Sequence, residues 1–229
     1  MRALLFDFFG TLVEFDAGRH TDQATRAHAL AAAHGYTGTL SDLDDEWESH
    51  FVSMEAESRA TLVEFSMTDV ADRFLASNPA ITGLEPAELG ATYVRQWSEH
   101  VVPIDGVAEM LERLASEWAI AVVSNTHDAD MVPRMLAVMG LADVVDVTLL
   151  SVDHGRAKPH PSIYEAALLR LGAAADECVF IGDSLGPDHT GPTALGMRAL
   201  LIDPDGHQGV PEVDRIGSVL DVEERVQGW

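Results

Sequence analysis

The chain has 229 residues, of which 47% are hydrophobic, and its 38 acidic against 14 basic residues give a formal charge of −24. This size fits one large domain, or a core with a smaller insert. Such a charge disfavours nucleic acid and anionic membranes as partners, and no apolar segment predicts a signal peptide or a membrane span. The single cysteine, Cys178, excludes an internal disulfide and favours a reducing, cytoplasmic location.

The first predicted strand is an apolar run over residues 4–6, which ends in the carboxylate of Asp7. A buried carboxylate is unfavourable unless it is paired or bound to a metal. Ligands of open α/β sheets bind at the carboxyl ends of the strands, which is where Asp7 would lie. Taken alone, Asp7 is either a site residue or a cap of the following turn.

The stretch from residue 16 to residue 100 predicts helices and no strand. Ser41 is the expected N-cap of the second helix, because an acid-rich first turn follows it. The predicted helices span residues 20–34, 41–59, 68–77 and 85–100.

Beyond residue 102 the pattern changes to alternating strands and helices, which predicts right-handed βαβ units around a parallel sheet. We therefore expect a core of residues 1–15 and 101–229, with residues 16–100 inserted as a helical domain. The predicted strands are 119–123, 145–150, 178–181 and 198–202, and the main helices are 105–116, 128–139 and 161–171.

Polar residues follow three of the buried strands. Asp7 ends the first, Ser124 and Asn125 end the second, and Asp183 follows the strand at Cys178, with Asp188 five residues later. Lys158, the only lysine of the chain, precedes a predicted helix. Each alone fits a cap or turn, but parallel strands end at one edge of a sheet, so we expect all of them to gather there.

These motifs in this order resemble the haloacid dehalogenase-like hydrolase superfamily. The resemblance covers nearly the whole chain and is weakest in the helical insert. It implies a Rossmann-like three-layer α/β core with a parallel sheet, plus an inserted all-helical cap domain. It also implies a nucleophilic role for Asp7, with Ser124 and Asn125 as the second motif, Lys158 as the third, and Asp183 with Asp188 as the acidic fourth.

The resemblance further implies Mg²⁺ held by the carboxylates of Asp7, Asp183 and Asp188 and by the backbone carbonyl of Phe9. Carboxylates are hard oxygen ligands suited to this ion. A carboxylate nucleophile forms a covalent intermediate that water then opens. Lys158 would neutralise the nucleophile and the transferring group.

The expected substrate is a small anionic molecule, bound as the insert closes over Asp7. The Ser124 hydroxyl and the backbone of Asn125 and Thr126 would donate to it. Hinges are expected at residues 16–18 and 100–103, and the protein is expected to be a monomer or homodimer. The predicted substrate-binding residues are Phe9, Gly10, Thr11, Thr126 and, from the insert, Arg19 and Arg59.

Phe9 departs from the pattern of the phosphatases in this superfamily. They carry a second aspartate two residues after the nucleophile, which protonates the leaving group and later activates water. General acid–base help of this kind is worth ~10²–10⁴-fold in rate, and a phenylalanine supplies none of it. Glu14, His20 and His127 are candidate substitutes, although each also fits an ordinary surface or capping residue.

Three functions stay open at this point. A Mg²⁺-dependent phosphohydrolase is favoured, because the acidic pair of Asp183 and Asp188 is the more specific signal and indicates a metal site. A metal-independent 2-haloacid dehalogenase is the alternative, since that branch carries an aromatic residue at position 9 and halide leaves without a proton. The third is a weakly active or non-catalytic binding protein. The phosphonatase branch is set aside, because it relies on a cap lysine and the insert contains none.

Overall fold

The computed structural model describes residues 2–15 and 24–227. Its main sheet has six strands in the order β5-β4-β1-β6-β7-β8, and every neighbouring pair is parallel. This agrees with the α/β class predicted from the alternating pattern. The strands are β1 Ala3–Phe6, β4 Ala119–Ser124, β5 Val147–Leu150, β6 Cys178–Gly182, β7 Arg198–Ile202 and the unpredicted, two-residue β8 Arg215–Ile216.

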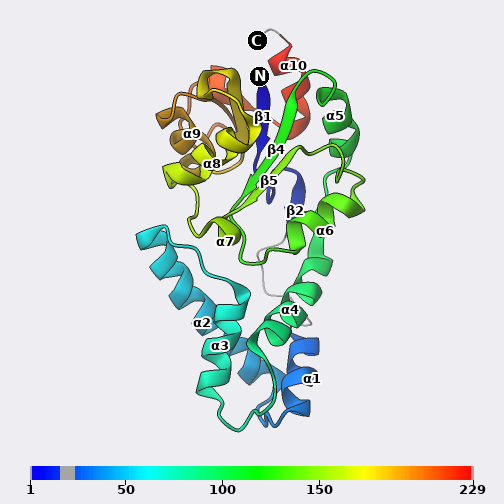
Figure 1. Ribbon diagram of the computed structural model, residues 1–229, viewed down its shortest axis with the longest axis vertical. Helices are drawn as coiled ribbons and strands as arrows, with labels where there is room; N and C mark the ends of the chain where they lie inside the picture. Colours follow the sequence, from blue (N-terminus) through cyan, green and yellow to red (C-terminus); the bar gives the residue numbers. More distant parts are fainter. Residues whose placement is uncertain (1, 16–23, 228–229) are drawn as a thin grey trace.

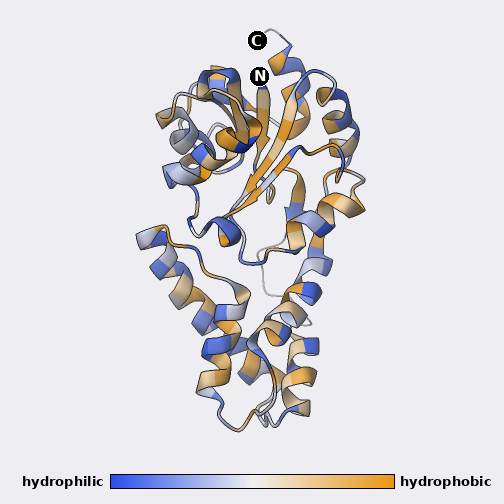
Figure 2. Ribbon diagram, in the orientation of Figure 1, coloured by the Kyte–Doolittle hydropathy of each residue, from blue (hydrophilic) through white to orange (hydrophobic). Residues whose placement is uncertain are grey.

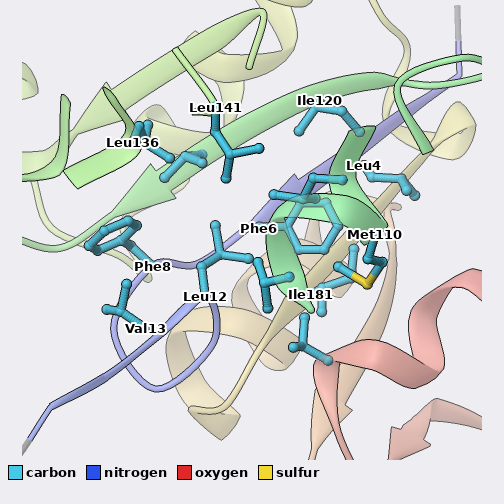
Figure 3. Close-up of a cluster of buried hydrophobic side chains, with 14 of the residues drawn as sticks. Leu4, Phe6, Phe8, Leu12, Val13, Met110, Ile120, Leu136, Leu141 and Ile181 are labelled. Atoms are coloured by element: carbon cyan, nitrogen blue, oxygen red, sulfur yellow. The ribbon is translucent and has the colours of Figure 1, made fainter. Parts of the chain in front are cut away.

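Helices cover both faces of this sheet, so the core has three layers. Because successive side chains of a strand point to opposite faces, Leu4 and Phe6 pack on one side and Leu5 on the other. Figure 3 shows the first side, where Leu4 and Phe6 meet Met110. The strands are correspondingly apolar along their length (Figure 2). The first side carries α5 Val107–Leu114, α6 Met131–Val138 and α10 Val222–Val226, and the second carries α8 Pro161–Leu171.

The inserted helices have an apolar cluster of their own, centred on Trp47 and Phe74. Trp47 stacks on Tyr93, with ring centroids 4.5 Å apart. These contacts join helices of the stretch that we expected to be inserted, and the division into two domains stays a prediction. The helices are α1 Thr25–Ala33, α2 Leu40–Thr61, α3 Met67–Ser77 and α4 Pro86–Trp97.

The N-cap of α2 is Thr39 rather than the expected Ser41. The Thr39 hydroxyl accepts a hydrogen bond from the Asp42 amide at 3.2 Å, and the Asp42 carboxylate accepts one from the Thr39 amide at 2.8 Å. This reciprocal capping box satisfies two backbone donors that Ser41 would leave unpaired. The N-cap therefore lies two residues earlier than expected, and the helix begins at Leu40.

The insert is joined to the core through a short antiparallel ribbon. Strand β2, Val13–Phe15, pairs with β3, Val101–Pro103, which spans part of a predicted hinge. Three residues are too few to show a strand period, and the pairing joins segments far apart in the chain. The other predicted hinge, residues 16–18, lies outside the described residues.

Figure 1 shows the helical insert lying beyond the carboxyl ends of β1 and β4, on the side away from the chain ends. The edge of the sheet that carries the predicted site residues therefore faces the insert.

Within residues 2–15 and 24–227, no helix combines the length and the apolar character that a membrane span requires.

Candidate active site

Asp7 lies at the end of β1, in the middle of the sheet, and is only 8% exposed. Its amide donates to the Ile181 carbonyl at 2.8 Å, which fixes the start of the following loop on β6. Gly10 in that loop has φ +73°, and a side chain there would collide with the Asp183 carboxylate. The glycine therefore lets the loop carrying Asp7 pack directly against Asp183.

Lys158 bridges two of the buried carboxylates. Its Nζ lies 2.8 Å from Asp7 Oδ1 and 2.7 Å from Asp188 Oδ1, and the residue is 3% exposed. Asn125 holds the backbone of Lys158: its Nδ2 donates to the Lys158 carbonyl at 3.0 Å, and its Oδ1 accepts from the Lys158 amide at 2.7 Å. The third motif is thus positioned by the second.

Asp7, Asp183 and Asp188 each bring a carboxylate oxygen to one place, within 4.8 Å of one another. Asp188 is fully buried and accepts from the Ser184 amide at 3.0 Å. A side chain at Gly182 would collide with the Asp188 carboxyl group. Three hard oxygen donors around one point fit a magnesium ion, so these residues suit the metal that the sequence predicts.

The charges at this point are unbalanced, because three carboxylates face one ammonium group. Burial, reinforced by Asp188 and Asp183 and opposed by Lys158, raises the pKa of Asp7 to about 7. Burial and the neighbouring Asp188 also raise the pKa of Asp183. Lys158 itself is buried, but the two carboxylates that it contacts raise its pKa and keep it charged. The cluster of three carboxylates and one ammonium group therefore favours the binding of a further cation.

Ser124 is fully buried at the end of β4, and its hydroxyl makes one long hydrogen bond, 3.3 Å to the Asn125 carbonyl. The Thr126 amide, predicted to donate to substrate, already donates to Ser151 Oγ at 2.9 Å. We therefore keep the Ser124 hydroxyl and the backbone amide of Asn125 as the candidate substrate donors of this loop, and leave Thr126 out.

Phe9 belongs to an aromatic cluster at the junction between core and insert. Its ring centroid lies 5.2 Å from that of Phe8, 5.4 Å from that of Phe15 on β2 and 6.1 Å from that of Trp97 at the end of α4. Glu14, one candidate substitute for the missing acid, lies exposed on β2. Another candidate, His20, lies outside the described residues.

The other predicted substrate contacts are placed differently. Thr11 is fully buried, and its hydroxyl has no hydrogen-bond partner in the described parts of the chain. Buried hydroxyls in folded proteins usually have a hydrogen-bond partner, so Thr11 remains a candidate substrate contact. Arg59 pairs with Glu55 on the same helix, at 2.7 Å, and its side chain is 76% exposed, as expected of a solvated arginine. Arg19 lies outside the described residues.

The structure also contains a polar network that the sequence analysis did not predict. Glu64, between α2 and α3, has a side chain that is 2% exposed and lies 3.0 Å from His127 Nδ1. The Ser151 hydroxyl donates to the second oxygen of Glu64 at 2.6 Å. Three segments far apart in the chain meet here. The one local signal is an acid in the otherwise apolar run from Leu62 to Phe65.

Several known proteins are similar to this chain. It is 29% identical over 221 residues to the ribulose-1,5-bisphosphate 5-phosphatase of Halopiger xanaduensis, which covers 92% of this chain and 88% of that protein. It is 28% identical over 186 residues to the (S)-2-haloacid dehalogenase of Xanthobacter autotrophicus, covering 80% and 68%.

Two solved structures share the fold over nearly their whole length. The 2-haloacid dehalogenase of Pseudomonas syringae pv. Tomato superimposes with a TM-score of 0.69 at 22% identity, covering 100% of both chains. The HAD phosphatase of Thermococcus onnurineus gives 0.66 at 23% identity, covering 100% of this chain and 99% of that one. A family model described as a haloacid dehalogenase-like hydrolase matches residues 1–192, so the chain belongs to this family of hydrolases.

Proposed function

We propose that this hydrolase is a Mg²⁺-dependent phosphohydrolase acting on a small phosphate monoester, with Asp7 as the nucleophile. The observation that carries the proposal is the meeting of three carboxylates, from Asp7, Asp183 and Asp188, around a single lysine. One ammonium group leaves the site negative. A phosphate dianion would be repelled from it unless a further cation were bound.

Asp7, Asp183, Asp188 and the carbonyl of Phe9 would hold the magnesium ion. When bound, the ion supplies positive charge that screens the nucleophile from the phosphate. The protein's own groups do the rest. Lys158 holds Asp7 through a bond of 2.8 Å, and the Ser124 hydroxyl and Asn125 amide are left to orient the phosphoryl oxygens.

Sugar phosphates are the first substrates to assay, because the Halopiger xanaduensis relative is named for ribulose 1,5-bisphosphate and aligns over 92% of this chain. A panel of phosphomonoesters should be assayed with Mg²⁺ and with a chelator. We expect phosphate release that the chelator abolishes. Asp7→Asn should abolish turnover while leaving thermal unfolding nearly unchanged, because asparagine still accepts a hydrogen bond from Lys158. Full activity of this variant would disprove a nucleophilic role for Asp7.

A 2-haloacid dehalogenase is the second candidate, favoured by the aromatic surroundings of Phe9. Carbon–halogen cleavage needs no proton at the leaving atom, and so needs no acid at this position. The same assay with 2-chloropropionate separates the two functions. Chloride release that is indifferent to the chelator would support the dehalogenase and refute the phosphohydrolase. If neither substrate turned over while a ligand still bound, the chain would be a binding member of the family.

A further inference from the structure

The imidazole of His127 is held in one orientation and one tautomer. Its Nδ1 lies 3.0 Å from the Glu64 carboxylate and 3.2 Å from the Phe65 carbonyl. Both partners are acceptors, so Nδ1 carries a proton. The ring stacks on Phe65, with centroids 4.1 Å apart, and meets the edge of Phe51 at 5.2 Å. The chemistry of this residue is therefore confined to Nε2.

Glu64 is the charged partner of this ring. Burial opposes its ionisation, but hydrogen bonds from His127, Ser151 and the Phe65 amide hold the pKa of Glu64 below its ordinary value. The neighbouring Asp128 is turned away, since its carboxylate accepts from backbone amides at the start of α6. A carboxylate on Nδ1 stabilises the positive charge that the ring carries when Nε2 is also protonated.

The pair is joined to the candidate active site through the loop after β4. The Ser151 hydroxyl, which donates to Glu64, accepts from the Thr126 amide, and the preceding Asn125 holds Lys158. Strands β4 and β1 are neighbours in the sheet, so this loop begins beside Asp7. Nε2 of His127 makes no hydrogen bond to any described residue, and the side chain is 26% exposed.

We propose that His127, positioned by Glu64, supplies the proton that Phe9 cannot. The proposal rests on the phosphohydrolase function proposed above. As an Asp7 oxygen bonds to phosphorus, the bond to the leaving oxygen breaks with its electron pair, and that oxygen takes the Nε2 proton to become an alcohol. The neutral ring then accepts a proton from the water that attacks phosphorus. The Asp7–phosphorus bond breaks, and phosphate is released.

The test compares two leaving groups in single-turnover and burst experiments with the Mg²⁺-loaded enzyme. Nitrophenolate leaves p-nitrophenyl phosphate without a proton, whereas the alcohol of ribose 5-phosphate needs one. His127→Asn is the main variant, because its amide can still donate to Glu64 while Nε2 is lost. We expect a ~10²–10⁴-fold loss of the first step with ribose 5-phosphate, and a nitrophenolate burst within about threefold of the wild type.

The pH profile gives a readout that a structural role would not move. With ribose 5-phosphate, the wild-type rate should depend on pH through the proton that the leaving oxygen takes, and His127→Asn should lack this dependence. Glu64→Gln keeps a hydrogen-bond partner for the ring but removes the charge, so it should slow the first step with ribose 5-phosphate more than the nitrophenolate burst. His34→Gln, on a histidine bonded to Leu30 within the insert, is the matched control and should leave both profiles unchanged.

An equal loss with both substrates, or no loss with ribose 5-phosphate, would overturn the role of His127 while leaving the phosphohydrolase standing. If the wild type released phosphate from none of the phosphomonoesters in the panel, the proposed function itself would fail, and the proton donor with it. His127→Gln is the second variant, and the retained nitrophenolate burst serves as an internal measure that the protein is folded.

Discussion

Replacing Lys158 with methionine removes the one ammonium group beside the three carboxylates of Asp7, Asp183 and Asp188, and keeps most of the side-chain volume. The structure gives this charge two contacts, at 2.8 Å and 2.7 Å, and places Nζ 5.0 Å above the ring of Phe180. Removing one partner of a buried ion pair costs ~3–5 kcal/mol, because the other charge is left uncompensated. Asp7 can relieve part of this by protonation, since its pKa already lies at about 7.

We therefore expect Lys158→Met to lose ~3 kcal/mol at pH 7 in the presence of a chelator. In a chain of this size that is a fall in Tm of roughly 6–12 °C. Added Mg²⁺ should raise the Tm of the variant more than that of the wild type, because the carboxylates left behind would hold the ion more tightly. An ion present at 100 times its Kd stabilises by about 2.7 kcal/mol.

Thermal unfolding of wild type and variant, each with chelator and with Mg²⁺, measures these effects without any substrate. Arg156→Met is the matched control. It removes a nearby positive charge whose guanidinium bonds to the Thr61 carbonyl, at 3.1 Å, rather than to a carboxylate. Equal responses of Lys158→Met and the wild type to Mg²⁺ would refute the idea that the three carboxylates form the metal site. A variant as stable as the wild type in chelator would refute the electrostatic reasoning.

Three further predictions concern Phe9, Glu64 and the net charge of the chain. Phe9→Asp should lower stability by roughly 2–4 kcal/mol, because three aromatic contacts are lost, and should restore alkyl phosphate turnover to His127→Asn, as rapid-quench kinetics would show. Glu64→Gln should lower the free energy of unfolding by about 1–3 kcal/mol at pH values above 4.5, the ordinary pKa of this carboxyl group. Because the folded-state pKa is depressed, this difference should vanish in urea titrations as the pH falls below it. The Tm should rise between 0.1 M and 1 M NaCl, because the charge of −24 is increasingly screened; a fall would contradict this.

The core of the fold was predictable because its strands are short apolar runs ended by turns. The runs at residues 4–6, 119–123 and 178–181 became β1, β4 and β6 with boundaries within one residue. The ribbon of β2 and β3 was not predictable, since three residues show no period and its stability comes from pairing across the chain. The cap of α2 could have been found: Thr39 followed three residues later by Asp42 is the signature of a capping box.

Asp7, Asp183, Asp188 and Lys158 could be expected to meet, because parallel strands end on the same edge of a sheet. No local pattern predicts that Glu64 would meet His127 and Ser151. That meeting depends on how the segment between α2 and α3 lies on the core, where the Met67 amide donates to the His127 carbonyl at 2.8 Å and the Ala157 amide to the Leu62 carbonyl at 3.1 Å. Contacts between an insert and a core are properties of the packed structure.

The position of Phe9 explains why a proton donor would lie elsewhere in this chain. Its ring packs between Phe15 on β2 and Trp97 at the end of α4, the two segments that join the insert to the core. A carboxylate there would lose this packing and add a fourth acid beside three carboxylates, where burial and Asp188 already raise the pKa of both Asp7 and Asp183. A donor on His127 avoids both effects, because the negative charge of its acidic partner Glu64 is stabilised by contacts with His127 and Ser151. In this arrangement the side chain of Phe9 packs between insert and core, and His127 in the loop after β4 transfers the proton.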